Sequence, residues 1–141
     1  MRLSSGSTSV TRTRGAGGGV VAWQWVRGGE PVDLWRAWDG RTPRMQALAS
    51  YPLLPWSNRI SGGGFEHAGR FHALAPNTPD DPYPIHGDGW LQPWQLAGID
   101  GDRAEMRLRS ERHGGSPYTY EATQVFTLVD GGLVQSLSVV N

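Results

Sequence analysis

Residues 120–140 read Tyr-Glu-Ala-Thr-Gln-Val-Phe-Thr-Leu-Val-Asp-Gly-Gly-Leu-Val-Gln-Ser-Leu-Ser-Val-Val, and this stretch decides the fold class. Two runs rich in β-branched and aromatic residues, Tyr120 to Val129 and Leu133 to Val140, flank Asp130-Gly131-Gly132. Glycines at that point supply the positive φ angles that a tight hairpin turn requires. The stretch therefore predicts two antiparallel strands joined by a short turn.

The last of these strands carries an alternating pattern. Leu133, Leu137 and Val139 share one face, which predicts a half-buried antiparallel strand. The chain stops at Asn141, directly after this apolar run. A terminal apolar strand leaves an open edge, which complete domains usually cover or blunt. We therefore expect a sandwich that is incomplete at its C-terminus.

Further β-rich runs, bounded by glycine, proline and aspartate, precede this hairpin. They are Gly19 to Val26 and Val32 to Trp38 around a turn at Arg27-Gly28-Gly29-Glu30, a hairpin from Phe65 to His72 with its bend near Ala68-Gly69, and Ala104 to Ser110. Apolar side chains on both faces of Gly19 to Val26 predict a buried strand. A helical turn is expected only within Thr42 to Ala49. Short strands punctuated in this way predict one all-β domain, an antiparallel sandwich or barrel.

The composition of the 141 residues excludes several classes of function. Thirteen basic residues balance thirteen acidic ones, so no net field favours nucleic acid or an acidic membrane surface. Because the chain contains neither lysine nor cysteine, Schiff-base, P-loop, thiol and disulfide chemistry are absent. The N-terminus lacks the apolar run of a signal peptide, and a cytoplasmic protein is the default expectation. A small neutral partner fits this composition best.

Several motif matches have simpler explanations. Gly17 to Ala22 has the letters of a dinucleotide loop, but a tryptophan-rich strand follows where a helix is needed. Gly62-Gly63-Gly64 lacks the Lys-Ser or Lys-Thr of a phosphate loop. His67 and His72 have no third ligand at a recognisable spacing, and Asp80-Asp81 suits a solvated loop. We therefore predict neither a metal site nor a cofactor.

The segment from Tyr51 to Trp94 places polar groups among prolines and aromatic residues. Arg59, next to Asn58, offers a guanidinium fork beside an amide, which could bind several hydroxyls of a polyol. Trp56, Trp90 and Trp94 could give apolar faces to a sugar ring. Composition alone favours the alternative, in which the arginine forms a structural salt bridge and the tryptophans fill the core.

These segments resemble the aldose 1-epimerase (galactose mutarotase) family, in which the same elements occur in the same order. Here they are Asn58-Arg59-Ile60, Phe65 to Gly69, His86-Gly87, Trp90 and Pro93-Trp94. The resemblance extends from the N-terminal Gly-Gly hairpin to the last strand. It implies a galactose mutarotase-like β-sandwich, of which residues 1–141 are the N-terminal part, and a monosaccharide such as glucose or galactose as partner.

The resemblance also implies a reaction and its residues. The family interconverts α and β anomers by acid/base ring opening without a cofactor, and Asn58, Arg59 and His86 would line the sugar pocket. His86 would assist proton transfer, since imidazole donates near neutral pH and an adjacent arginine discourages its charged form. The family's second histidine, its sugar-binding aspartate and its glutamate base lie in a distal half that this chain does not match. The glutamates Glu66, Glu105, Glu111 and Glu121 resemble no base motif.

Three functions are therefore compatible with the sequence. The first is an aldose 1-epimerase whose general base lies outside this chain. The second is a non-catalytic carbohydrate-binding or regulatory protein on the same sandwich, because fold alone does not decide function. The third is a half-domain that self-associates through its open strand edge.

Overall fold

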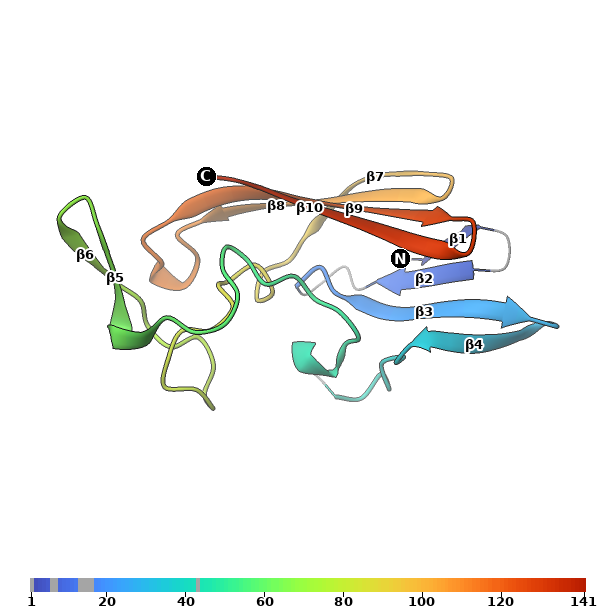
Figure 1. The fold of residues 1–141 in the computed structure, drawn as a ribbon, viewed down its shortest axis with the longest axis horizontal. Helices are drawn as coiled ribbons and strands as arrows, with labels where there is room; N and C mark the ends of the chain where they lie inside the picture. Colours follow the sequence, from blue (N-terminus) through green and yellow to red (C-terminus); the bar gives the residue numbers. More distant parts are fainter. Residues whose placement is uncertain (1, 6–7, 13–16, 43) are drawn as a thin grey trace.

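The computed structural model describes the backbone of residues 2–5, 8–12, 17–42 and 44–141, and antiparallel strands dominate it (Figure 1). The first sheet has the order β1-β2-β3-β4, with β1 Arg2–Ser5, β2 Thr8–Arg12, β3 Val20–Arg27 and β4 Glu30–Trp35. The second has the order β10-β9-β8-β7, with β7 Gln95–Asp100, β8 Arg103–Glu111, β9 Thr119–Val129 and β10 Gly132–Val140. A separate hairpin joins β5, Gly64–His67, to β6, Arg70–Ala73.

Helical structure is confined to short 3-10 turns in the described part of the chain. These turns are η1, Met45–Ala47, η2, Ser61–Gly63, and η3, His113–Gly115. No helical segment among the described residues has the length and apolar character that a bilayer-spanning helix needs. The long segment between β4 and β7 is therefore mostly irregular, apart from these turns and the β5–β6 hairpin that projects from one end of the molecule (Figure 1).

Strands β8 and β9 present one continuous buried face. Alternate residues point to the same side of a strand, and every second residue from Ala104 to Ser110 and from Tyr120 to Leu128 is buried. The two strands pair in register, so their buried residues lie side by side; Ala104 faces Phe126, and Leu108 faces Ala122. The first sheet packs against one part of this face, and the central loops pack against the other.

The sandwich core lies where one end of that face meets the first sheet. Phe126, Leu128 and Ala104 pack there against apolar residues of β1, β2 and β3. The buried residues of this first cluster are Leu3, Val10, Val20, Ala104, Phe126 and Leu128. Burying aromatic and aliphatic groups in this way supplies the main favourable term that holds two sheets together.

A second cluster covers the other end of the same face. Here the partners of β8 and β9 are Leu54 and Trp94, which come from the irregular segments rather than from a sheet. Its buried members are Leu54, Trp94, Met106, Leu108, Tyr120 and Ala122. The loop that contains Leu54 is thus anchored to the sheet.

Most strand predictions are confirmed. The hairpins at 20–35, 64–73 and 119–140 form where the turn residues indicate, and a helical turn lies within Thr42 to Ala49, but the prediction of helical turns only there is wrong, because η2 and η3 lie elsewhere. In the β5–β6 hairpin, Ala68 and Gly69 have φ angles of 49° and 71°, as its bend requires. The predictions missed β1 and β2, which are short and mostly polar, and β7, whose Gln-Leu-Ala-Gly-Ile-Asp sequence lacks a strict alternation of apolar and polar residues.

Two burial predictions are wrong. Strand β3 is buried only near its start, and Trp25 at its far end is exposed, because β3 extends beyond the second sheet's cover. Strand β10 was expected to be half buried, yet Leu137 and Val139 are 43% and 42% exposed. Strand β10 pairs with β9 along one edge; Leu133 at its start packs against the first cluster, but the residues after Leu133 are exposed.

Replacing Phe126 by alanine tests the sandwich core. Because Phe126 is 0% exposed, Phe126→Ala should lower the free energy of unfolding by about 3–5 kcal/mol through lost burial and the cavity left behind. Denaturant unfolding of the full-length protein measures the change. Val32→Ala in β4, where Val32 is 46% exposed, is the control and should cost under about 1 kcal/mol. Equal losses in the two variants would contradict the packing described.

Candidate functional site

Two loop segments that are far apart in sequence run side by side and form the candidate site. The backbone N–H of Ile60 donates to the carbonyl of Pro84 at 3.2 Å, and the N–H of His86 donates to the carbonyl of Asn58 at 2.9 Å. Arg59 and Ile85 form an antiparallel bridge between these bonds. The structure therefore brings Asn58, Arg59 and His86 together, although 28 residues separate Asn58 from His86.

A close backbone approach fixes the chain just after His86. The N–H groups of Asp88 and Gly89 both donate to the carbonyl of Leu54, at 2.8 and 3.0 Å. Gly87 lies so near Leu54 that a Cβ atom at this position would sit 1.8 Å from the Leu54 oxygen, and its φ angle is +61°. Only glycine fits there. Since Leu54 is buried against β8 and β9, this contact ties the histidine to the sheet.

A backbone hydrogen bond determines which ring nitrogen of neutral His86 carries the proton. Its Nδ1 accepts a hydrogen bond of 2.9 Å from the backbone N–H of Asn58. A neutral imidazole that accepts at Nδ1 carries its proton at Nε2, so Nε2–H is a donor. Burial, and next the positive charge of Arg59, lower the pKa of His86 below its ordinary value of 6.5, while Asp81 partly opposes them. The neutral form is therefore favoured near neutral pH.

An ion pair orients Arg59. Its Nε donates to Oδ2 of Asp81 at 2.7 Å, and Nη2 lies 2.6 Å from the same oxygen. The other oxygen, Oδ1, accepts from the backbone N–H of Tyr83 at 3.1 Å. These hydrogen bonds, with that of Arg59 foremost, lower the pKa of Asp81. Because the Arg59 side chain is half exposed, the pair adds at most about 1 kcal/mol of stability, and its main effect is to aim the guanidinium.

Asn58 completes the polar cluster. Its Oδ1 accepts from the backbone N–H of Arg59 at 3.0 Å and lies 3.4 Å from Nη1 of the same residue. Its backbone has a φ angle of 64°, which is uncommon outside glycine and which asparagine tolerates better than most residues. The guanidinium is thus held from two sides, by Asp81 and by Asn58, and keeps N–H groups for a hydroxyl-rich partner.

Two of the three tryptophans follow the alternative in which they fill the core. Trp90 and Trp94 are 4% and 3% exposed, and their indole N–H groups donate to the carbonyls of Gly87 and Gly89. They support the histidine loop from the core and offer no face to a ligand. Trp56 is half buried and packs edge-on against Tyr118, so it remains near the surface.

Sequence reasoning missed two residues of the site. Asp81 was expected in a solvated loop, but only 11% of its side chain is exposed in the ion pair with Arg59. Asn77 binds the backbone on both sides of His86 through its amide. The flanking prolines and the Asn-Thr-Pro-Asp-Asp run indicated only turns, because the partners of these side chains come from other parts of the chain.

The two histidines of the β5–β6 hairpin do not form a metal centre with their neighbours. The rings of His67 and His72 lie 6.1 Å apart, and His72 stacks on Phe65 at 5.4 Å. No group of three or more histidines, aspartates and glutamates gathers within the described residues.

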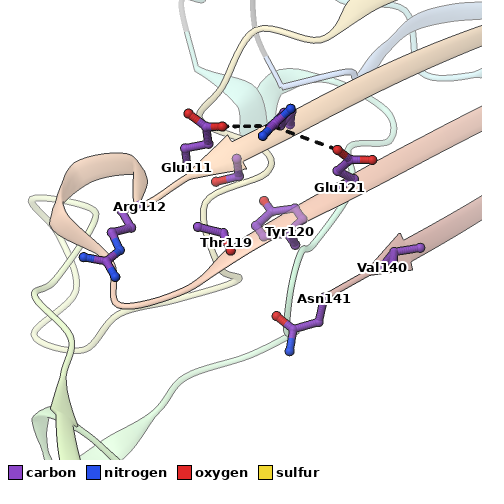
Figure 2. Close-up of a pocket in the computed structure, with 9 residues that line it drawn as sticks. Glu111, Arg112, Thr119, Tyr120, Glu121, Val140 and Asn141 are labelled. Carbon is purple, nitrogen blue, oxygen red and sulfur yellow. Dashed lines mark ion pairs between the residues drawn. The ribbon is translucent and has the colours of Figure 1, made fainter.

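Two cavities have linings that include none of the three predicted site residues. The first measures about 190 Å³, and Trp56, Asn77, Asp88, Ser116 and Tyr118 are among its lining residues. The second measures about 470 Å³ and opens beside the end of β10, where Arg109 pairs with Glu111 and Glu121 (Figure 2). This second hollow is lined by solvent-exposed ion pairs and by Val140 and Asn141, and we assign it no function.

A comparison with protein families matches residues 2–141 to the aldose 1-epimerase family. A curated relative, the uncharacterized protein YphB of Escherichia coli strain K12, is 40% identical over 91 residues, which cover 64% of this chain and 30% of that protein.

Solved structures show the same fold. A crystal structure from Escherichia coli K12, assigned provisionally as an aldose 1-epimerase, superposes with a TM-score of 0.82 at 30% identity and covers 99% of this chain and 45% of that one. A galactose mutarotase-like protein from Clostridium acetobutylicum gives 0.79 at 22% identity, with 99% and 45% covered. The chain therefore spans less than half the length of these relatives, and the galactose mutarotase-like sandwich predicted for it is confirmed.

The charges around His86 can be tested by titration. Arg59→Met removes a positive charge that disfavours imidazolium, so the pKa of His86 should rise. Asp81→Asn removes a negative charge that favours imidazolium, so the pKa of His86 should fall further. NMR titration of the His86 ring in the full-length protein measures both shifts. Arg107→Met, which removes an arginine that pairs with Glu105, is the control and should leave His86 unchanged. Shifts of the opposite sign would show that these charges do not act on His86.

Proposed function

Because this chain belongs to the aldose 1-epimerase family, we propose that the protein binds a monosaccharide at Asn58, Arg59 and His86 and interconverts its α and β anomers. The observation that carries the proposal is the hydrogen bond from the Asn58 N–H to Nδ1 of His86. This bond leaves the Nε2–H of a neutral imidazole as a donor beside an arginine.

Anomer exchange requires an acid and a base. A base removes the proton of the anomeric hydroxyl while an acid protonates the ring oxygen; the ring opens, the C1–C2 bond rotates, and the ring closes from the other face. Nε2–H of His86 is suited to donate a hydrogen bond to the ring oxygen or a neighbouring hydroxyl. The lowered pKa of His86 keeps the ring neutral, so it acts as a polar donor without adding a second positive charge beside Arg59.

Arg59 and Asn58 are suited to hold the substrate. A guanidinium with a planar set of N–H donors can contact adjacent sugar hydroxyls at the same time, and its ion pair with Asp81 reduces the freedom that would be lost on binding. The amide of Asn58 adds a donor and an acceptor of the kind that hydroxyls use. Relatives described as galactose mutarotase-like make hexoses the first sugars to test.

The general base is the part that the described residues do not provide. Asp81 is the carboxylate that the structure places in this cluster, and its two oxygens accept bonds from Arg59 and Tyr83. A carboxylate engaged in this way, with a lowered pKa, is a weak base for a sugar hydroxyl. We therefore place the base in the remainder of the full-length protein.

A non-catalytic sugar-binding protein is the second candidate. It is favoured by the hydrogen bonds of Asp81 to Arg59 and Tyr83, because they leave the cluster without a free carboxylate base. Binding needs only the donors of Arg59, Asn58 and His86, whereas turnover also needs the base. A protein of this kind would bind sugar in calorimetry without accelerating anomer exchange.

Polarimetry decides between the two candidates. With freshly dissolved α-glucose or α-galactose, the full-length protein should speed relaxation well above the buffer rate. His86→Ala should reduce kcat by about 10²- to 10⁴-fold, because the hydrogen-bond donor to the ring oxygen is lost. His113→Ala, which removes an exposed histidine of turn η3, is the control and should retain full activity. No acceleration by the full-length protein would eliminate the enzyme and leave the binding protein.

Arg59 is expected to contribute mostly to binding. Arg59→Ala should weaken sugar binding by at least about tenfold, since two or more hydrogen bonds to a charged group are lost. Isothermal titration calorimetry measures this loss under either candidate. The exposed Arg107, which pairs with Glu105, supplies the matched control Arg107→Ala. If Arg59→Ala and Arg107→Ala bind sugar equally well, Arg59 is not in the sugar site.

A further inference from the structure

Asn77 makes an unusually complete set of hydrogen bonds around His86. Its Oδ1 accepts from the N–H of Ile85 at 2.9 Å, and its Nδ2 donates to the carbonyls of Ile85 at 2.8 Å and Gly87 at 2.7 Å. The amide thus uses both of its donor hydrogens and one acceptor position. All three bonds go to the residues immediately before and after His86.

The chain at His86 is consequently bonded from both sides. In an extended segment successive peptide groups point in opposite directions. The carbonyl of Pro84 and the N–H of His86 point to the segment at Asn58 to Ile60, whereas the polar groups of Ile85 and the carbonyl of Gly87 point to Asn77. The side chain of Asn77 therefore makes the backbone hydrogen bonds that a neighbouring strand would make on that side.

His86 needs this support because its backbone is in an uncommon conformation. Its φ angle is 63°, in the left-handed region that is uncommon outside glycine, although histidine, like asparagine, adopts it more often than most residues do. Such a conformation persists only where the surrounding bonds determine it, and residues of this kind gather at functional sites. The Leu54 carbonyl fixes the chain from Asp88 onward, whereas the N–H and C=O groups of Ile85 and the carbonyl of Gly87 have their bonds from Asn77.

We propose that Asn77 is a positioning residue for His86: its amide fixes the backbone on both sides of the histidine and so keeps Nδ1 on the Asn58 N–H and Nε2–H directed at the substrate. This inference rests on the proposed function of the site, in which His86 donates from Nε2. Asn77 does not touch the substrate in this proposal and acts only through His86.

The proposal requires an amide and not merely a polar side chain. Aspartate has nearly the same shape and keeps the acceptor for the Ile85 N–H. It replaces the NH₂ group with an oxygen that faces two carbonyl oxygens, so two attractive contacts become repulsive. Alanine removes all three bonds without repulsion. The order of effects should therefore be Asp worse than or equal to Ala, despite the closer fit of Asp.

Kinetics of the full-length protein provide the first measurement. Asn77→Asp and Asn77→Ala should lower kcat by about 10- to 100-fold, as expected for a misplaced catalytic donor, while KM changes by less than about threefold. The matched control is Gln124→Ala, which removes a buried amide bonded to the Gly18 carbonyl and to Gln135, outside the site. This control should lose thermal stability and keep its kcat within about twofold.

The protonation pattern of His86 provides a readout that a general loss of stability does not move. In the wild type, two-bond ¹H–¹⁵N spectra at a pH above its pKa should show one neutral tautomer, with the proton on Nε2. The Asn77 variants should show a mixture of tautomers, since the Asn58 N–H no longer meets Nδ1. Asn77→Ser, which replaces the amide with a short hydroxyl that cannot make all three bonds, is measured as a further variant and should also show a mixture of tautomers.

Two results would overturn the proposal. One is a kcat within twofold of the wild type in the Asn77 variants while His86→Ala is inactive. The other is an unchanged Nε2–H tautomer in variants that lose activity only as much as Gln124→Ala does. Failure of the proposed function is a separate result: the wild type then shows no anomer exchange, yet the tautomer comparison still decides whether Asn77 positions His86.

Discussion

The structure depends on the single buried face that strands β8 and β9 share. One end of this face packs against the first sheet through Phe126 and Leu128, and the other end holds Leu54 and Trp94 from the central loops. Leu54 then fixes the position of the site, because its carbonyl accepts hydrogen bonds from the N–H groups of Asp88 and Gly89, just beyond Gly87. A sheet with period-two burial therefore supports both the sandwich and the histidine loop.

The site has the character of a pre-arranged set of donors. His86 accepts at Nδ1 and is kept neutral by burial and by Arg59, and Arg59 in turn is aimed by Asp81. Each restraint is modest in energy, since most of these groups are partly exposed. Their combined effect is geometric: they hold the donors in place, which in the proposed function reduces the freedom that these side chains would lose when a sugar binds. In our proposal, Asn77 restrains the backbone of His86 in the same way, through its hydrogen bonds to Ile85 and Gly87.

Local sequence signals predicted some of these features and missed others for identifiable reasons. The hairpin at 119–140 follows from alternation and its glycine turn, both of which act between near neighbours. Asn58, Arg59 and His86 were found through their family resemblance. For Trp90 the sequence left a core role and a ligand-facing role open, because an indole N–H that bonds a backbone carbonyl in the core looks the same in sequence as one that meets a sugar.

The sequence by itself determined the all-β class, the principal hairpins and the identity of three polar residues of the candidate site. The class and the hairpins arise from side-chain periodicity and turn chemistry, which are local, whereas the three polar residues were recognised through the family resemblance. Only the tertiary structure decided that Asp81 pairs with Arg59, that Asn77 brackets His86 and that the imidazole proton resides on Nε2. Each of these depends on where a donor from one loop meets an acceptor from another, and that distance is set by packing on β8 and β9.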